Sequence, residues 1–238
     1  MHKTLQKIFS MLFALSVFIS CSTDVIVVYD ISGDRFTRLI EKQWQNFSKF
    51  LILDVRTEQE YLEGHFYDAL NYPISDIEKR YKEIEDYKTL PIYIYGRTTD
   101  QSFKAAKVLA ENGFTQIYNC EGTEETEYTF YTYNPIRLKT GFTLAHERGF
   151  HLVDYRTQDA RTICPVPEAN FITFPNLDEI INAIDYSEGY IIFSTNITHA
   201  RDCAREFTEY GFKNVYYCID NILEYPEYFS TENIDNSN

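Results

Sequence analysis

The segment "IYIYGRTTDQSFKAAKVLAENGFTQIYNC" (Ile92–Cys120) returns without a gap as "YIIFSTNITHARDCAREFTEYGFKNVYYC" (Tyr190–Cys218). Two shorter stretches recur as well. "LILDVRTEQ" at 51–59 matches "HLVDYRTQD" at 151–159, and "ALNYP" at 69–73 loosely matches "ANFITFP" at 169–175. Repetition at a fixed spacing is the signature of duplicated structural units. The chain therefore reads as two copies of one module, and this repeat decides the fold.

Each copy alternates apolar runs with amphipathic segments. We expect strands at 25–31, 50–56, 92–95, 115–120, 151–156 and 190–194, and helices at 34–44, 74–87, 102–112, 137–150, 177–184 and 199–210. This alternation predicts an α/β fold with a central parallel sheet and helices on both faces. The loops at the carboxyl ends of the strands then hold any site. The acidic, tyrosine-rich stretch 123–135 has no helical period, so we place the domain boundary near 131–135.

The N-terminus has the pattern of an export signal. Lys3 and Lys7 precede an apolar run at 8–19, which is too short to span a bilayer but suits a signal-peptide core. Cys21 follows a small residue at the end of this run, as in the lipobox of bacterial lipoproteins. We expect cleavage after residue 20 and lipid attachment at Cys21, with an ordinary signal peptide or an uncleaved anchor as the alternative. Ser22 at the next position favours an outer membrane if the cell has one.

The acidic charge excludes some partners. The full chain carries a formal charge of −14, and loss of residues 1–20 removes two lysines and no acid, which makes it −16. Such a surface repels nucleic acid and anionic lipid headgroups. We expect no nucleic-acid partner, and membrane attachment through the N-terminal lipid rather than through charge.

The first copy, "LILDVRTEQEYLEGHFYDALNYP", resembles the opening signature of the rhodanese family, with Asp-x-Arg, Gly-His and Ala-x-Asn-x-Pro. The second copy keeps "LVDYRT" and "GFKNVYYC". The resemblance implies an α/β fold of two tandem rhodanese-like domains at 24–130 and 131–230. These follow the signal peptide at 1–20 and precede a polar tail at 231–238.

The resemblance also implies a chemistry. In this family a loop cysteine takes up a sulfane sulfur as a persulfide and passes it to cyanide or another thiol. By alignment, that cysteine position is Gly96 in the first copy and Ser194 in the second. Sulfur exchange needs a thiolate, which neither residue supplies. A Ser194 nucleophile would need a base, and no acid in the loop orients His199 for that role.

The other cysteines do not stand out as replacements. Cys120, Cys203 and Cys218 have the pattern of small core residues, and Cys164 lies in a loop as the best candidate for an exposed thiol. The sequence does not fix their disulfide state. The histidines lack the spacing of a metal site, so no metal and no cofactor is expected.

The charged signature residues have a structural and a catalytic interpretation. Asp54 and Arg56, like Asp154 and Arg156, are expected to hold the loop after their strand rather than to act in catalysis. We expect His65 to pack within its loop. In the first loop, Asp100 and Glu121 are expected to oppose an anion.

The second loop has no acid, so it is the better candidate for a retained anion site. The residues of this possible anion-binding loop are Ser194, Thr195, Asn196, Thr198, His199 and Arg201. The leading hypothesis is an exported, membrane-anchored binding or scaffold protein without sulfurtransferase activity, whose partner is an unknown protein or a small anionic ligand. One alternative is a sulfurtransferase or other enzyme with a non-standard site. The other is a surface adhesin that binds through its aromatic residues.

Overall fold

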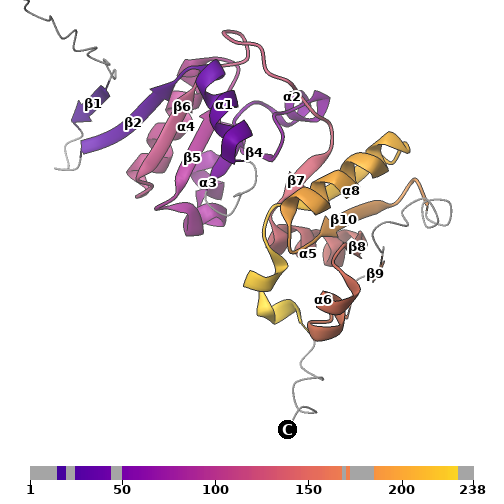
Figure 1. Cartoon of the computed structure of the whole chain (residues 1–238). Coiled ribbons are helices and arrows are strands. Elements are labelled where there is room, and N and C mark those ends of the chain that lie inside the picture. Colours follow the sequence, from indigo (N-terminus) through magenta and orange to yellow (C-terminus); the bar gives the residue numbers. More distant parts are fainter. Residues whose placement is uncertain (1–14, 20–24, 44–49, 168–169, 172–184, 230–238) are drawn as a thin grey trace, which may run out of the picture.

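The computed structural model describes residues 15–19, 25–43, 50–167, 170–171 and 185–229. These residues form two α/β units, each built around its own sheet, and the chain passes from the first unit to the second beside α8 (Figure 1). The expected fold class, with parallel sheets flanked by helices, is confirmed.

The first sheet has the strand order β1-β2-β6-β5-β3-β4. Its strands are β1 (Leu15–Ile19), β2 (Val25–Ile31), β3 (Leu51–Asp54), β4 (Ala69–Asn71), β5 (Pro91–Tyr95) and β6 (Gln116–Cys120). All neighbours pair in parallel except β1, which runs antiparallel to β2 at the edge. Because β3 and β5 are adjacent parallel strands, the loops that follow them lie at the same edge of the sheet.

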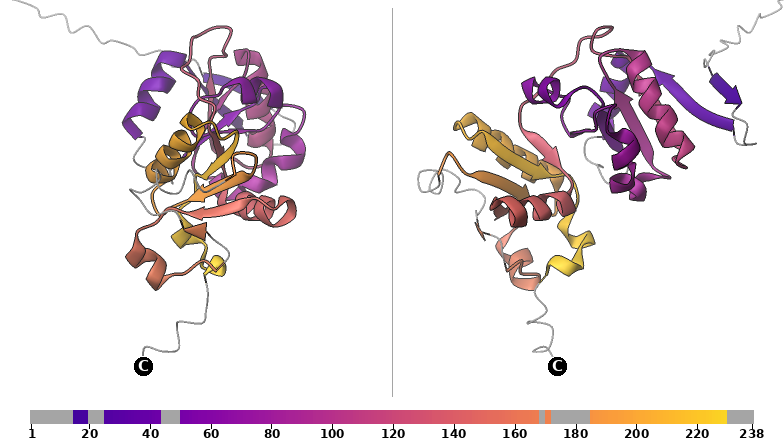
Figure 2. Two further views of the ribbon diagram at one scale, coloured as in Figure 1. Left: turned by 90° about the vertical axis from the view of Figure 1, so that its right-hand side faces the viewer. Right: turned by 180° about the vertical axis from the view of Figure 1, so that it is seen from behind.

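Helices cover both faces of this sheet (Figure 2). The helices are α1 (Gly33–Gln43), α2 (Glu58–Glu63), α3 (Ile77–Arg80) and α4 (Thr99–Glu111), with a 3-10 segment η2 (Tyr81–Tyr87) after α3. Strand side chains alternate between the faces. Ile94 packs in the cluster that contains α4, whereas Tyr95 packs in the cluster that contains α1. Tyr95 thereby buries its ring under α1 at the end of β5.

The second sheet repeats this arrangement with the order β7-β11-β10-β8-β9, all in parallel. Its strands are β7 (Asn134–Ile136), β8 (His151–Asp154), β9 (Asn170–Phe171), β10 (Gly189–Phe193) and β11 (Asn214–Cys218). The helices α5 (Leu138–Arg148) and α8 (Ile197–Glu209) cover opposite faces, and α6 (Gln158–Ile163) follows β8. Short 3-10 segments η3 (Ile222–Glu224) and η4 (Pro226–Tyr228) follow β11.

Once β1 is set aside, the two strand orders correspond position by position. The order β2-β6-β5-β3-β4 matches β7-β11-β10-β8-β9. The helices after the central strands also end alike, because Gly113 and Gly211 follow α4 and α8 with φ of 88° and 100°. A left-handed residue closes many helices and glycine adopts it without steric cost. Among the described residues, no strand of the second sheet corresponds to β1.

Two expectations differ from the structure. The helix expected at 74–87 is broken into α3 and η2, and Ile84 inside η2 has a non-helical backbone (φ −123°, ψ 23°). The short helices α2 and α6 were not expected. Each begins at a threonine, Thr57 or Thr157, whose hydroxyl accepts a hydrogen bond from the third helical N–H. The helix expected at 177–184 lies outside the described residues.

Candidate functional site

The loop between β5 and α4 is closed by its own side chains. A Cβ atom added to Gly96 would lie 2.7 Å from Oε1 and 3.2 Å from Cβ of Gln101, so Gln101 fills the space beside the glycine. Gln101 Oε1 accepts from the Arg97 N–H at 2.7 Å. The backbone also packs tightly, since a Cβ on Gly122 would lie 2.3 Å from the Arg97 carbonyl oxygen. A side-chain oxygen of the chain itself therefore accepts the hydrogen bond of a loop N–H.

The N-terminus of α4 is also occupied. Glu125 Oε2 accepts from the Thr99 N–H at 3.0 Å, from the Thr99 hydroxyl, and from the Gly122 N–H at 2.8 Å. The Thr99 hydroxyl and the Gly122 N–H lower the pKa of Glu125 because they bind its charged form. A helix N-terminus favours an anion. In this loop the anion is a carboxylate of the chain.

The other charges around this loop lie differently from the sequence-based expectation. Glu121 does not enter the loop; its carboxylate accepts from the Gly33 N–H of α1 at 2.8 Å. Asp100 lies exposed in the first turn of α4. Arg97 pairs with Glu124 at 3.0 Å and Glu60 at 3.3 Å. The expectation for Glu121 was wrong because the strand end turns its side chain toward α1.

Sequence reasoning missed Glu125, although a signal was present. The acidic run 121–127 follows β6 directly, and the carboxyl ends of β5 and β6 are neighbours in the sheet. A carboxylate from that acidic run could therefore be expected to lie close to the N-terminus of α4.

The second loop places Ser194 at the position of Gly96. Ser194 is 2% exposed, and its hydroxyl donates to the Tyr155 carbonyl oxygen at 3.2 Å. In the first unit, Gln101 Nε2 donates to the matching Val55 carbonyl oxygen at 3.4 Å. Ser194 thus holds a backbone carbonyl of the preceding loop, which is a structural role.

The remaining residues of the possible anion-binding loop point in different directions. Asn196 caps α8 by accepting from the Thr198 N–H at 2.9 Å, Thr195 is partly buried, and His199 is exposed. Arg201 is buried and donates through Nη1 to Asp68 Oδ2 of the first unit at 2.8 Å. The anion site stays a prediction, and the strongest cation predicted for it already binds a carboxylate.

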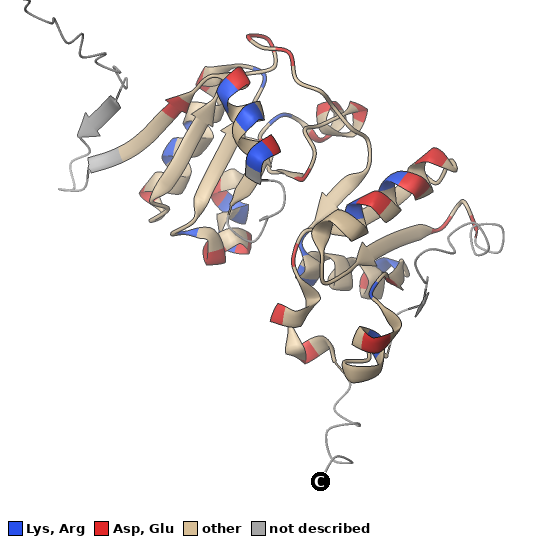
Figure 3. Cartoon of the chain, in the orientation of Figure 1, with Lys and Arg blue, Asp and Glu red and all other residues tan. Residues whose placement is uncertain are grey.

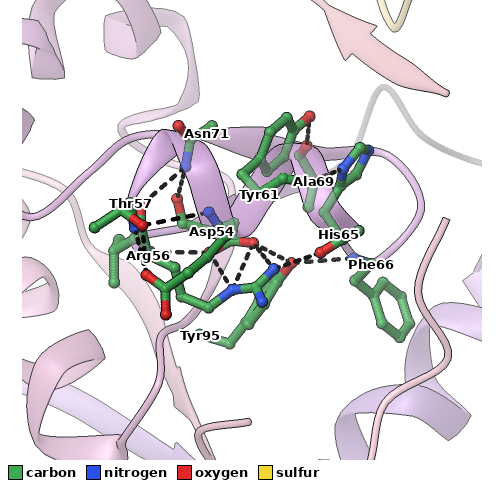
Figure 4. Close-up of polar contacts among 12 residues, drawn as sticks. Asp54, Arg56, Thr57, Tyr61, His65, Phe66, Ala69, Asn71 and Tyr95 are labelled. Atoms are coloured by element: carbon green, nitrogen blue, oxygen red, sulfur yellow. Dashed lines mark hydrogen bonds and ion pairs between the residues drawn. The ribbon is translucent and has the colours of Figure 1, made fainter. Parts of the chain in front are cut away.

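The two Asp-x-Arg pairs have the same geometry, and Figure 4 shows the first. Arg56 lies 2.6 Å from Asp54 and donates to the Gly64 carbonyl oxygen at 2.8 Å. Arg156 lies 2.6 Å from Asp154 and donates to the Cys164 carbonyl oxygen at 2.8 Å. All four side chains are buried. The structural interpretation of these pairs is confirmed, since each arginine ties the strand end to the end of the following short helix.

In the first unit a tyrosine completes the network. Tyr95 donates its hydroxyl hydrogen to Asp54 Oδ2 at 2.7 Å and accepts from the Phe66 N–H at 3.0 Å (Figure 4). His65 stacks on Tyr61 with ring centroids 3.8 Å apart. Its ring nitrogens lie 3.0 Å from the Tyr61 carbonyl oxygen and 3.2 Å from that of Tyr133. The expectation that His65 packs within its loop is confirmed.

Comparison with known proteins gives the family. The sequence model of the family described as "Rhodanese-like domain" matches residues 32–123. An uncharacterized protein of Bacillus subtilis strain 168, YqhL, is 32% identical over 114 residues, which cover 48% of this chain and 89% of YqhL. The chain belongs to the rhodanese-like family. The matched region ends before β7.

Other rhodanese-like relatives cover smaller parts of the chain. The thiosulfate sulfurtransferase PspE of Escherichia coli K12 is 27% identical over 73 residues, or 31% of this chain and 70% of PspE. The crystal structure of a thiosulfate sulfurtransferase from Pseudomonas aeruginosa is 16% identical. It covers 81% of this chain and 41% of that one, with a TM-score of 0.36.

Three of the described cysteines of this rhodanese-like chain lie inside the core. Cys120, Cys203 and Cys218 are at most 1% exposed, and burial raises the pKa of each thiol well above its ordinary value. A buried thiol with a raised pKa is a poor nucleophile. Cys164 is partly buried, and all four are free thiols. Cys21 lies outside the described residues.

In the part of the chain that the structure describes, no group of three or more His, Cys, Asp or Glu side chains could hold a metal ion. Among the described helices, none is long and apolar enough to cross a bilayer.

Proposed function

We propose that this chain is a tandem rhodanese-like protein that lacks sulfurtransferase activity and acts as a binding or scaffold protein at the cell envelope. The matching strand orders of the two sheets support a second rhodanese-like copy at 131–230 after the first at 24–130. The arginine bonds of Arg56 and Arg156 support it as well, because each reaches the carbonyl eight residues further along the chain.

The observation that carries the proposal is the state of the two loops. Relatives such as PspE are thiosulfate sulfurtransferases, and sulfur exchange needs an accessible thiolate. At the first loop, Gly96 offers no side chain, and Gln101 and Glu125 take the N–H groups of Arg97 and Thr99. At the second, the Ser194 hydroxyl is buried and bonded to a carbonyl. Neither loop therefore offers a sulfur on which a persulfide could form, and in the first loop two N–H groups that could receive its charge already have acceptors.

The proposed location rests on the N-terminal pattern. We place the protein outside the cytoplasm, anchored through a lipid on Cys21 after removal of residues 1–20. In a Gram-negative cell the outer membrane is the proposed site. The removed stretch includes β1, and the five described strands that remain in the first sheet match the order of the second sheet, which supports this removal. Metabolic labelling with a fatty acid analogue should mark the wild-type chain and leave Cys21→Ser unmarked.

An assay of thiocyanate production tests the lack of sulfurtransferase activity. The full chain is incubated with thiosulfate and cyanide, with PspE as the positive control. We expect no thiocyanate above the buffer background. Cys164 is the partly buried one among the described cysteines. Its substitution therefore tests the alternative that the chain is a sulfurtransferase with a non-standard site. Thiocyanate production that disappears after alkylation or in Cys164→Ala would establish a non-standard active site and reject the proposal.

A further inference from the structure

A hollow of about 600 Å³ lies between the two units. Tyr67 of the first unit and Tyr131 and Tyr133 of the linker form one wall, and Arg201, Asp202 and Arg205 of α8 form the other. We call it the tyrosine cleft. Its volume is within the range of small-molecule sites, about 300–1,000 Å³. Both units and the linker contribute to it, so the cleft exists only in the assembled chain.

The tyrosine wall consists of three aromatic rings with their hydroxyls. The ring centroids of Tyr67 and Tyr131 are 5.9 Å apart, and those of Tyr131 and Tyr133 are 5.5 Å apart. Burial raises the pKa of Tyr133 to about 12 and raises that of Tyr67 further. The hydroxyls of Tyr67 and Tyr133 therefore stay protonated at neutral pH, where each can donate and accept a hydrogen bond. An apolar face with a polar rim suits a ligand of mixed character.

The arginines of the opposite wall already have carboxylate partners. Arg201 lies 2.8 Å from Asp68, and Arg205 lies 3.5 Å from Asp202 and 3.8 Å from Glu209. Acidic and basic residues are interspersed along α8 (Figure 3). An anionic ligand would have to compete with these carboxylates for the guanidinium groups. A cationic ligand would meet the Arg201 guanidinium, which already lies 5.4 Å from the centre of the Tyr67 ring.

We propose that the tyrosine cleft binds a neutral saccharide. The C–H faces of a sugar ring pack against aromatic faces, and its hydroxyls pair with tyrosine hydroxyls, arginine N–H groups and carboxylate oxygens. Glu41 of α1 adds a further acceptor at the rim. Paired arginines and carboxylates suit this ligand. Their remaining donors and acceptors can bind sugar hydroxyls, and because the charges neutralise each other, the ligand needs no charge of its own. The inference specifies the ligand of the binding role under Proposed function and rests on that role.

Because the cleft walls come from both units, a bound saccharide should stabilise the contact between them. A ligand that binds only the folded chain raises its stability in proportion to the logarithm of one plus the ligand concentration over Kd. A rise in Tm with saccharide concentration is therefore expected together with the heat of binding.

Calorimetric titration of the full chain tests the proposal. The probes are maltotriose, cellotriose, chitotriose and mannotriose, with sulfate, tetramethylammonium and a decaproline peptide as probes of other chemistries. We expect at least one trisaccharide to bind. Tyr131→Ala should weaken it at least about tenfold, and Tyr131→Phe should weaken it much less. The control is Tyr210→Ala, an exposed tyrosine outside the cleft, which should bind as the wild type does.

Tyr131→Ala is suited to the test because the hydrogen bonds of Tyr131 to the backbone N–H and C=O of His65 are made by its own backbone. Alanine therefore keeps both bonds. Thermal unfolding verifies that Tyr131→Ala is folded. Lack of heat with every trisaccharide at about ten millimolar, a millimolar Kd being the weakest useful affinity, would overturn the proposal. So would equal losses in Tyr131→Ala and Tyr210→Ala, or binding of sulfate, tetramethylammonium or decaproline alone in a Tyr131-dependent way. Thiocyanate production by a chain that still binds a trisaccharide would reject the proposed function and leave the saccharide site intact.

Discussion

Asp68 of the first unit binds Arg201 of the second, with Arg201 Nη1 2.8 Å from Asp68 Oδ2. The Asp68 carboxylate also accepts a hydrogen bond from the Tyr217 hydroxyl at 2.5 Å. The hydroxyl oxygen of Tyr217 accepts in turn from the Asp68 N–H at 3.0 Å. Asp68 is the non-glycine residue with positive φ (59°) among the described residues, a conformation that aspartate and asparagine tolerate best. A buried three-residue network thus joins the two units.

Breaking the ion pair between Asp68 and Arg201 should lower the stability of the folded chain. Removal of one partner of a buried pair leaves an uncompensated charge, so Asp68→Asn and Arg201→Ala should each lower the free energy of unfolding by about 3–5 kcal/mol. Urea unfolding of both single variants and the double variant measures this. The double variant should be more stable than the sum of the single losses predicts, because the two residues share one interaction.

Lys107→Ala is the control for this pair. Lys107 and Glu111 form an exposed pair, with side chains 57% and 48% exposed, and its loss should change stability by less than about 0.5 kcal/mol. Equal losses of stability in Lys107→Ala and Asp68→Asn would contradict the proposal that the Asp68–Arg201 pair holds the two units together. Strictly additive losses at Asp68 and Arg201 would contradict it as well.

Tyr95→Phe should destabilise the first unit although it removes one oxygen atom. The change leaves the Phe66 N–H without its acceptor and removes one of the donors to Asp54, inside a fully buried network. An unsatisfied buried group costs about 1–3 kcal/mol. Tyr186→Phe, at a 46% exposed ring, is the matched control and should be close to neutral. If both variants unfold at the same urea concentration, the hydroxyl of Tyr95 contributes nothing to the loop.

The fold was predictable where periodicity is strong. β2 and the helices α4 and α8 appear close to the expected positions, because burial against the sheet imposes period 2 on strands and 3.6 on helices. The pairs around Asp54 and Asp154 were also predictable, since their partners are two residues away.

The partners of Arg201 and of the α4 N-terminus were not predictable in the same way. Asp68 is separated from Arg201 by 133 positions, and Glu125 from Thr99 by 26. Such contacts depend on how units and loops pack, which local sequence patterns do not encode. The repeat itself placed Gly96 and Ser194 at equivalent sites, but it did not reveal that Gln101 fills the first of them.

His65 should make stability depend on pH. Burial lowers its pKa below the ordinary value of 6.5, so the unfolded chain binds a proton more readily than the folded chain does. The contribution is therefore fully present above pH 6.5 and is lost as the pH falls from 6.5 through the folded pKa. Unfolding in urea at about pH 7.5 and about pH 5.5 should show this loss in the wild type.

The control for this prediction is a second histidine. His65→Gln should weaken the pH dependence in this window, whereas His146→Gln, at an exposed position of α5, should retain it. A wild-type slope that survives in His65→Gln would assign the effect to other groups.

Gly96→Ala should report directly on the filled loop. A methyl group there would lie 2.7 Å from Gln101 Oε1, so Gln101 must leave and the Arg97 N–H loses its acceptor. We expect a loss of about 1 kcal/mol, the net value of one hydrogen bond. Gln101→Ala removes both the nearest obstacle, Oε1, and the acceptor, and it should cost a similar amount. Gly96→Ala added to Gln101→Ala should then cost little more, which urea unfolding measures.

Gly113→Ala separates this local effect from a general cost of replacing glycine. Nothing lies within 4 Å of a Cβ at Gly113, but its φ of 88° strains any other residue. Its cost, about 1 kcal/mol, should therefore be the same with Gln101 or with alanine at that position. If the stability loss of Gly96→Ala depends on Gln101 and that of Gly113→Ala does not, Gln101 occupies the space beside Gly96. A side chain at position 96 must then displace Gln101. Full additivity of Gly96→Ala and Gln101→Ala would show instead that the loop has room, and a loop with room keeps its N–H groups open to a ligand.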